Sequence, residues 1–189
     1  VLLWFAAWTL GRLVVGLTLG PIRLLQSERA VFDFGVGLSL LTLWTLLCGL
    51  TGQLASGVLL APSGAAAMIL IRKWTTRSRS SAESWVVPGT AIHERVDRGM
   101  LLLLMIIPVP FVLHIFLGGM TPPFDFDVCE YHLQGPKEWL QNGSIQPLEH
   151  NVYTSFPFLS EMLSLNAMVL GGDWWQGAIT GKLAMTSFQ

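Results

Sequence analysis

Charged residues are scarce in this sequence, and their scarcity argues against a soluble fold. Asp, Glu, Lys and Arg make up 12% of the 189 residues, whereas soluble domains carry about 25%. The net charge of −1 removes the electrostatic basis for binding nucleic acid. Only two cysteines are present, too few for a disulfide framework. Apolar residues instead reach 52%, so we expect a chain embedded in a membrane.

The apolar residues come in blocks that approach the length of a membrane span. A helix needs about 20 mostly apolar residues to cross the hydrocarbon core. Such blocks occupy residues 2–20, 31–52, 54–71, 100–120 and 153–170, and a further block begins at residue 174. We therefore predict an all-α fold, a polytopic bundle of transmembrane helices. Because the last block is cut short and no leader sequence is legible, we expect a piece of a longer protein.

Basic residues predict the orientation of these spans. Residues 72–98 contain six Lys and Arg side chains, whereas residues 121–154 contain only Lys137. Short loops rich in Lys and Arg stay in the cytoplasm. We therefore predict three spans in residues 1–71, a cytoplasmic basic linker in 72–98, and an extracytoplasmic loop at 121–154 within residues 99–189. Ser80 then lies inside and Gly143 outside, and Pro108 and Pro110 should bend the fourth span.

The predicted outer loop is too long and too acidic for a simple connection. Helix connections in bundles usually take about two to eight residues. This loop contains five acids against one lysine, namely Asp125, Asp127, Glu130, Glu138, Glu149 and Lys137. Its many aromatic residues argue against disorder. Pro136 is expected to start a short amphipathic helix that ends at Gly143, with Trp139 buried against lipid or other helices.

Two aspartates in this loop alternate with apolar residues. In an extended backbone, residues 124–128 would place Asp125 and Asp127 on one side and both phenylalanine rings on the other. Paired acids could hold a divalent cation, could act as a general base and its electrostatic partner, or could form a hydrated edge. Their position directly after a span favours a functional role.

The residues that follow carry a specific pattern. Asp127 is followed by Tyr131-His132-Leu133 and then by Pro136-Lys137, and further on by a Tyr-x-x-x-Pro stretch at 153–157 and by Glu161. Over about residues 120 to 175, this pattern resembles the C-type integral-membrane glycosyltransferases. That superfamily includes protein O-mannosyltransferases and enzymes that take aminoarabinose or mannose from polyprenyl phosphates.

The resemblance implies a reaction and a set of site residues. It implies transfer of a sugar from a polyprenyl-phosphate donor to an acceptor on the outer face of a bacterial inner membrane. Asp127 would be the base and Asp125 its partner, with a divalent ion on these two acids as an open alternative. The implied substrate-binding residues are Tyr131, His132, Lys137 and Glu161. The superfamily has many more spans, so we expect this piece alone to be inactive.

The sequence supports more than one interpretation of Glu161, of Lys137 and of the function of the protein. Glu161 is predicted to lie about 6 Å inside the fifth span, where a carboxylate is costly unless it faces protein or water. It could meet the substrate or bond to Ser160, Ser164 or Asn166. Lys137 could neutralise a donor phosphate or extend toward lipid headgroups. A transporter segment or an assembly scaffold is the competing function, but transporter sites usually lie near the midplane of the membrane.

Overall fold

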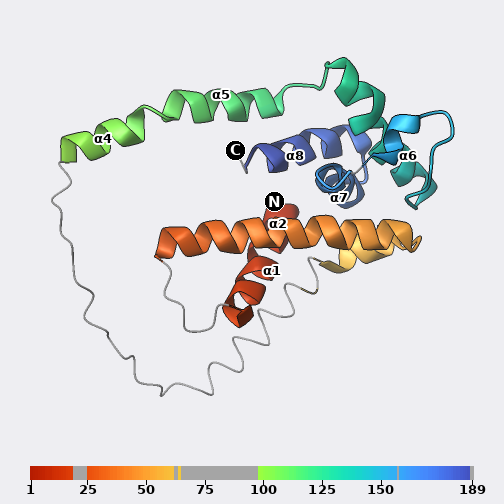
Figure 1. The fold of residues 1–189 in the computed structure, drawn as a ribbon, viewed down its shortest axis with the longest axis horizontal. Helices are drawn as coiled ribbons and strands as arrows, with labels where there is room; N and C mark the ends of the chain where they lie inside the picture. Colours follow the sequence, from red (N-terminus) through yellow and green to blue (C-terminus); the bar gives the residue numbers. More distant parts are fainter. Residues whose placement is uncertain (19–24, 62–63, 65–97, 157, 188–189) are drawn as a thin grey trace.

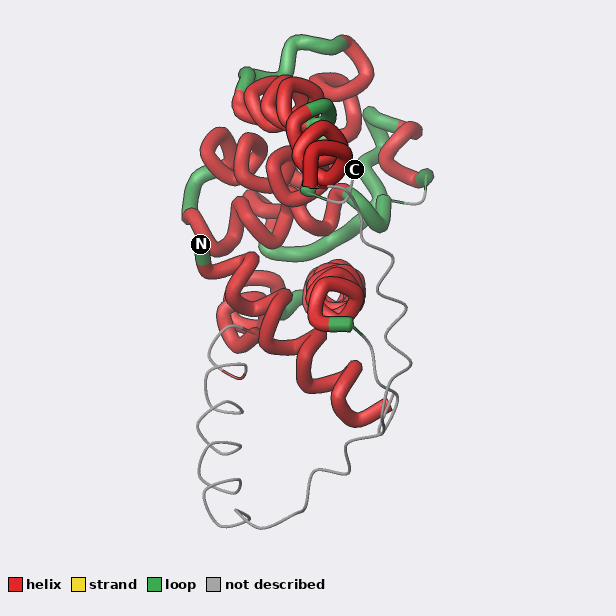
Figure 2. The backbone as a smooth tube through the Cα atoms, turned by 90° about the vertical axis from the view of Figure 1, so that its left-hand side faces the viewer, coloured by secondary structure: helices red, strands yellow, loops and turns green. Residues whose placement is uncertain are grey.

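In the part of the chain that the structure describes, helices are joined by turns and loops (Figure 1). The structure is a computed structural model that describes residues 1–18, 25–61, 64, 98–156 and 158–187. No strand occurs in these residues, so the predicted all-α fold is confirmed for them (Figure 2). The predicted cytoplasmic linker at 72–98, Arg98 apart, and nearly all of residues 62–71 lie outside the described part.

The first two helices cross in close contact. They are α1 (Leu2–Thr18) and α2 (Gln26–Leu50). A side chain on Gly11 would overlap the carbonyl oxygen of Asp33, and one on Gly37 would overlap that of Ala7. Glycine at these two positions therefore permits the crossing. Helix α2 begins at Gln26, five residues before its predicted start at residue 31. At this observed start, the Glu28 carboxylate accepts a hydrogen bond from the Leu25 N–H at 2.9 Å.

The fourth predicted span is divided by its prolines. It consists of α4 (Arg98–Ile106) and α5 (Val109–Met120), and regular helix is interrupted at residues 107–108. The predicted bend is therefore confirmed, since proline removes a backbone donor. Two of the described helical segments, Gln26–Leu50 and Leu102–Met120, are long and apolar enough to cross a membrane. Only 6% of the most apolar stretch of the second is buried within the protein.

The acidic stretch after α5 is helical sooner than predicted. Residues 126–127 are already helical and lead into a π-helical turn, η1 (Val128–His132). The extended backbone predicted for residues 124–128 is therefore wrong. The backbone groups here bond locally, because Cys129 N donates to the Asp125 carbonyl at 3.0 Å and Leu133 N donates to the Val128 carbonyl at 2.9 Å.

Helix α6 (Gln134–Asn142) confirms the short helix predicted in the loop. It begins two residues before Pro136, and it ends at Gly143, whose φ of 69° suits glycine. Trp139 is 3% exposed, so its predicted burial is also confirmed. The loop then continues to the 3₁₀ turn η2 (Val152–Ser155).

The predicted fifth span, residues 153–170, is not one helix. Its first residues form η2, and Phe156 is extended with φ −73° and ψ 162°, as expected for a residue before proline. Only α7 (Glu161–Gly171) remains, with 11 residues, which is about 16 Å of helix. The sixth segment forms α8 (Trp174–Thr186). Gly172, with φ 67°, makes the turn between them.

Helix α7 is the most enclosed element and sets the position of the loop. It packs against α2, α6 and α8, and all residues from Glu161 to Met168 are buried. The Ile145 N–H donates to the Gly49 carbonyl at 2.9 Å, so the end of α2 lies beside the loop. In Figure 1 the starts of α2 and α4 lie at the opposite end of the molecule.

Candidate functional site

Two residues of the predicted site form a close pair. Nδ1 of His132, at the end of η1, lies 2.5 Å from Oε1 of Glu161, at the start of α7. The Glu161 side chain is 9% exposed and the His132 side chain 40%. The Ser160 hydroxyl donates to the other Glu161 oxygen at 2.9 Å. The buried carboxylate therefore has a partner on each oxygen, which offsets the cost of its burial.

The predicted bond from Glu161 to Ser160 is confirmed, but the other two predicted partners lie elsewhere. Nδ2 of Asn166 donates to the Thr45 hydroxyl of α2 at 2.8 Å. The Ser164 hydroxyl is buried and has no hydrogen-bond partner in the described part of the chain. Glu161 therefore faces the loop through His132, and the rest of α7 faces the other helices.

Aromatic rings surround the pair. The Tyr131 ring lies 4.3 Å from the His132 ring and stacks on Tyr153 at 5.4 Å. The Phe158 ring lies 6.0 Å from His132 and meets Trp139 edge to face at 5.7 Å. These contacts limit the rotation of the imidazole. We call Tyr131, His132, Trp139, Tyr153, Phe158 and Glu161 the loop cluster.

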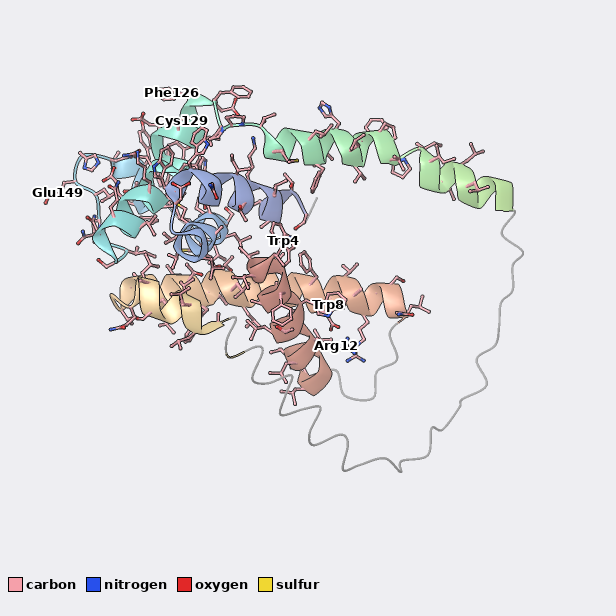
Figure 3. All side chains as sticks on the ribbon, turned by 180° about the vertical axis from the view of Figure 1, so that it is seen from behind. Trp4, Trp8, Arg12, Phe126, Cys129 and Glu149 are labelled. Carbon is pink, nitrogen blue, oxygen red and sulfur yellow. The ribbon has the colours of Figure 1, made fainter. Side chains whose placement is uncertain are left out.

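Hydrogen bonds within the loop hold the cluster together. Nδ2 of Asn151 donates to the Glu130 carbonyl at 2.8 Å, which ties the end of the loop to η1. The indole N–H of Trp139 donates to the Gln146 carbonyl at 2.9 Å. The acidic loop is therefore a folded cap over the start of α7. Figure 3 shows Phe126, Cys129 and Glu149 at this end of the molecule, away from Arg12 on α1.

Asp125 and Asp127 lie outside the loop cluster. Both are exposed, and within the described residues neither carboxylate makes a hydrogen bond or an ion pair. The described residues also contain no group of three His, Cys, Asp or Glu side chains that could hold a metal ion. The catalytic and metal-binding roles of the two aspartates therefore stay predictions from the sequence.

Lys137 points toward an aromatic ring. Its ammonium lies 4.3 Å from the centre of the Trp174 ring at the start of α8, a favourable cation–π distance. This contact joins α6 to α8. It is consistent with either predicted role, since the side chain is only half-buried.

Two contacts near the loop were not predicted from the sequence, one made by Lys182 and one between His150 and Glu138. Nζ of Lys182, on α8, lies 3.4 Å from the Thr121 carbonyl at the end of α5. From the sequence, this segment is predicted only as a membrane span. A single basic residue inside an apolar segment is the feature of the sequence that could have indicated such a contact. Nε2 of His150 lies 3.1 Å from Oε1 of Glu138. The His150 side chain is 65% exposed, so this second pair is a surface feature.

An apolar groove of about 560 Å³ lies beside the loop cluster. Trp139 and Phe158 belong to both. The groove also lies against the end of α2, the segment after α6 and the start of α7, through Leu46, Leu50, Ile145, Phe156, Leu159 and Met162. The groove and the His132–Glu161 pair are therefore linked through the shared ring of Phe158.

Comparisons with protein-family models, with curated proteins and with solved structures find no match for this chain.

Proposed function

We propose that the protein is a polytopic membrane glycosyltransferase that moves a sugar from a polyprenyl-phosphate donor to an acceptor on the outer face of a bacterial inner membrane. One observation carries most of the proposal. The sequence pattern implied that Tyr131, His132 and Glu161 bind substrate, and these residues pack into one cluster although His132 and Glu161 are 29 positions apart. The pattern did not require such a contact.

The arrangement of the ends supports the proposed orientation. The turn at residues 51–53 and the acidic loop lie at one end, since Ile145 bonds to Gly49. The starts of α2 and α4, near Arg29 and Arg98, lie at the other end (Figure 1). Arginine residues on the inner side follow the positive-inside rule. Lipid would cover α5, whose apolar side chains are almost all exposed.

The proposed reaction is a displacement at the anomeric carbon of the sugar. An acceptor hydroxyl attacks this carbon, and the polyprenyl phosphate leaves with the electron pair of the broken bond. Lys137, on the same helix as Trp139, supplies a positive charge for the departing phosphate. The resemblance assigns the proton of the hydroxyl to Asp127, with Asp125 as its partner. No step depends on a divalent ion, which stays a prediction from the sequence.

The groove suits the lipid part of such a donor. It is lined mainly by apolar side chains, and one of them, Phe158, has its ring centre 6.0 Å from that of His132. A lipid-linked sugar needs an apolar site next to a polar one. The groove and the cluster together offer that combination at the end of α2.

Separate substitutions of the two aspartates test the proposal. The full-length protein would be assayed in membranes for transfer from a panel of polyprenyl-phosphate sugars. We expect Asp127→Asn and Asp125→Asn to lower the rate, Asp127→Asn by about 10²- to 10⁴-fold if it removes the base. Glu149→Gln is the matched control, an exposed acid of the same loop that should keep the wild-type rate. Unchanged transfer in both aspartate variants would remove these two acids from the active site, and no transfer by the wild-type protein from any donor would contradict the proposed function.

A further inference from the structure

The His132–Glu161 pair has the geometry of a proton-transfer group. Glu161 is buried and contacts Nδ1 of His132 at 2.5 Å. When a carboxylate accepts the proton of Nδ1, the neutral ring presents Nε2 as a free acceptor. In the described part of the chain, no hydrogen bond to Nε2 is present. With 40% of its side chain exposed, His132 can reach a substrate.

The ring is also held in place. The rings of Tyr131 and Phe158 lie 4.3 Å and 6.0 Å from it, and Glu161 sits on the enclosed helix α7. The Asp127 carboxylate is not held in this way, since it is exposed and makes no bond within the described residues. A fixed base is worth more to catalysis than a mobile one, because its orientation is established before the reaction.

We propose that His132 accepts the proton of the attacking acceptor hydroxyl through Nε2, and that Glu161 is the positioning residue that orients the ring. The inference rests on the proposed sugar transfer and gives His132 the role that the sequence pattern gave to Asp127.

The step balances without a further reactant. The O–H bond of the acceptor breaks and its proton passes to Nε2. The oxygen forms a bond to the anomeric carbon, and the bond from that carbon to the phosphate oxygen breaks. The proton then leaves Nε2 for water. Throughout the step Nδ1 keeps its proton and its bond to Glu161.

The chain provides its own matched control. His150 and Glu138 also form an imidazole–carboxylate contact, at 3.1 Å, but His150 is 65% exposed and neither residue belongs to the loop cluster. The same substitutions made in this surface pair change the same chemical groups. They should leave sugar transfer at the wild-type rate.

The test compares the two pairs in the full-length protein, with expression levels and unfolding temperatures matched. We expect His132→Ala to lower transfer by about 10²- to 10⁴-fold, and added imidazole to restore part of it. Glu161→Gln should lower transfer by about 10²-fold and should cause no further loss in the His132→Ala background. His132→Gln serves instead if the alanine variant does not fold. His150→Ala and Glu138→Gln are the controls.

Rescue separates this inference from the proposed function. If transfer in Asp127→Ala returns with added formate, while imidazole leaves His132→Ala unchanged, Asp127 is the base and the inference is overturned although the protein is a transferase. A normal rate in His132→Ala overturns it as well. If the wild-type protein transfers no sugar from any donor, the proposed function fails and the inference fails with it.

Discussion

Burial of a carboxylate needs compensation, and Glu161 receives it from its neighbours. Its two oxygens accept from His132 and Ser160. The sequence identified both Glu161 and His132 as candidates, because a carboxylate in an apolar segment is costly and because both belong to a patterned run. Their pairing could not be predicted, since it depends on how the loop folds back onto α7.

Trp139 should be the residue on which the loop cluster depends most. It is 3% exposed, contacts Phe158 edge to face, and donates to the Gln146 carbonyl. We expect Trp139→Ala to lower the free energy of unfolding by about 3 to 5 kcal/mol. Thermal unfolding of the solubilised full-length protein would measure this. The control Trp175→Ala, at a residue 41% exposed, should cost less than about 1 kcal/mol.

At the scale of elements, α7 and α8 depend on close backbone packing. A side chain on Gly177 would overlap the backbone of Met168, and one on Gly181 would overlap that of Ser164. Two helices can approach this closely only where their side chains are small. The enclosed position of Glu161 therefore depends on two glycines of the next helix.

Gly177→Ala should loosen this hairpin. We expect a loss of about 1 to 3 kcal/mol in the free energy of unfolding, because the added methyl group has no space. Gly118→Ala in α5 is the control, since nothing lies within 4 Å of its added carbon. Equal stability of the two variants would show that α7 and α8 are not in close contact.

The elements also show what the sequence could and could not predict. Proline and glycine act locally, so the break before Val109 and the end of α6 at Gly143 could be read from the sequence. The alternation at residues 124–128 predicted an extended segment, but helical turns satisfy its backbone without a neighbouring strand. The block at 153–170 is apolar enough for a span, but only its second half forms a helix, α7, whose apolar residues from Met162 to Met168 are buried within the protein.

At the scale of the whole molecule, the account requires the acidic loop and the basic linker to lie on opposite sides of a membrane. Cys129 is exposed in the loop, whereas Cys48 is buried in α2. An impermeant maleimide should therefore label wild-type Cys129 in intact cells. In a Cys129→Ser background, a cysteine placed at Ser80 should be labelled only after the membrane is opened. Labelling of that cysteine in intact cells would reverse the topology.

The central claim is that sugar transfer takes place at the loop cluster, where α7 meets the acidic loop. The most direct measurement is the rate of sugar transfer by the full-length protein in proteoliposomes, with one substitution made at two places. Glu161 and Glu138 each contact a histidine, but only Glu161 belongs to the cluster. We predict that Glu161→Gln lowers the rate by about 10²-fold, whereas Glu138→Gln retains it. Equal rates in both variants and the wild-type protein would contradict the account.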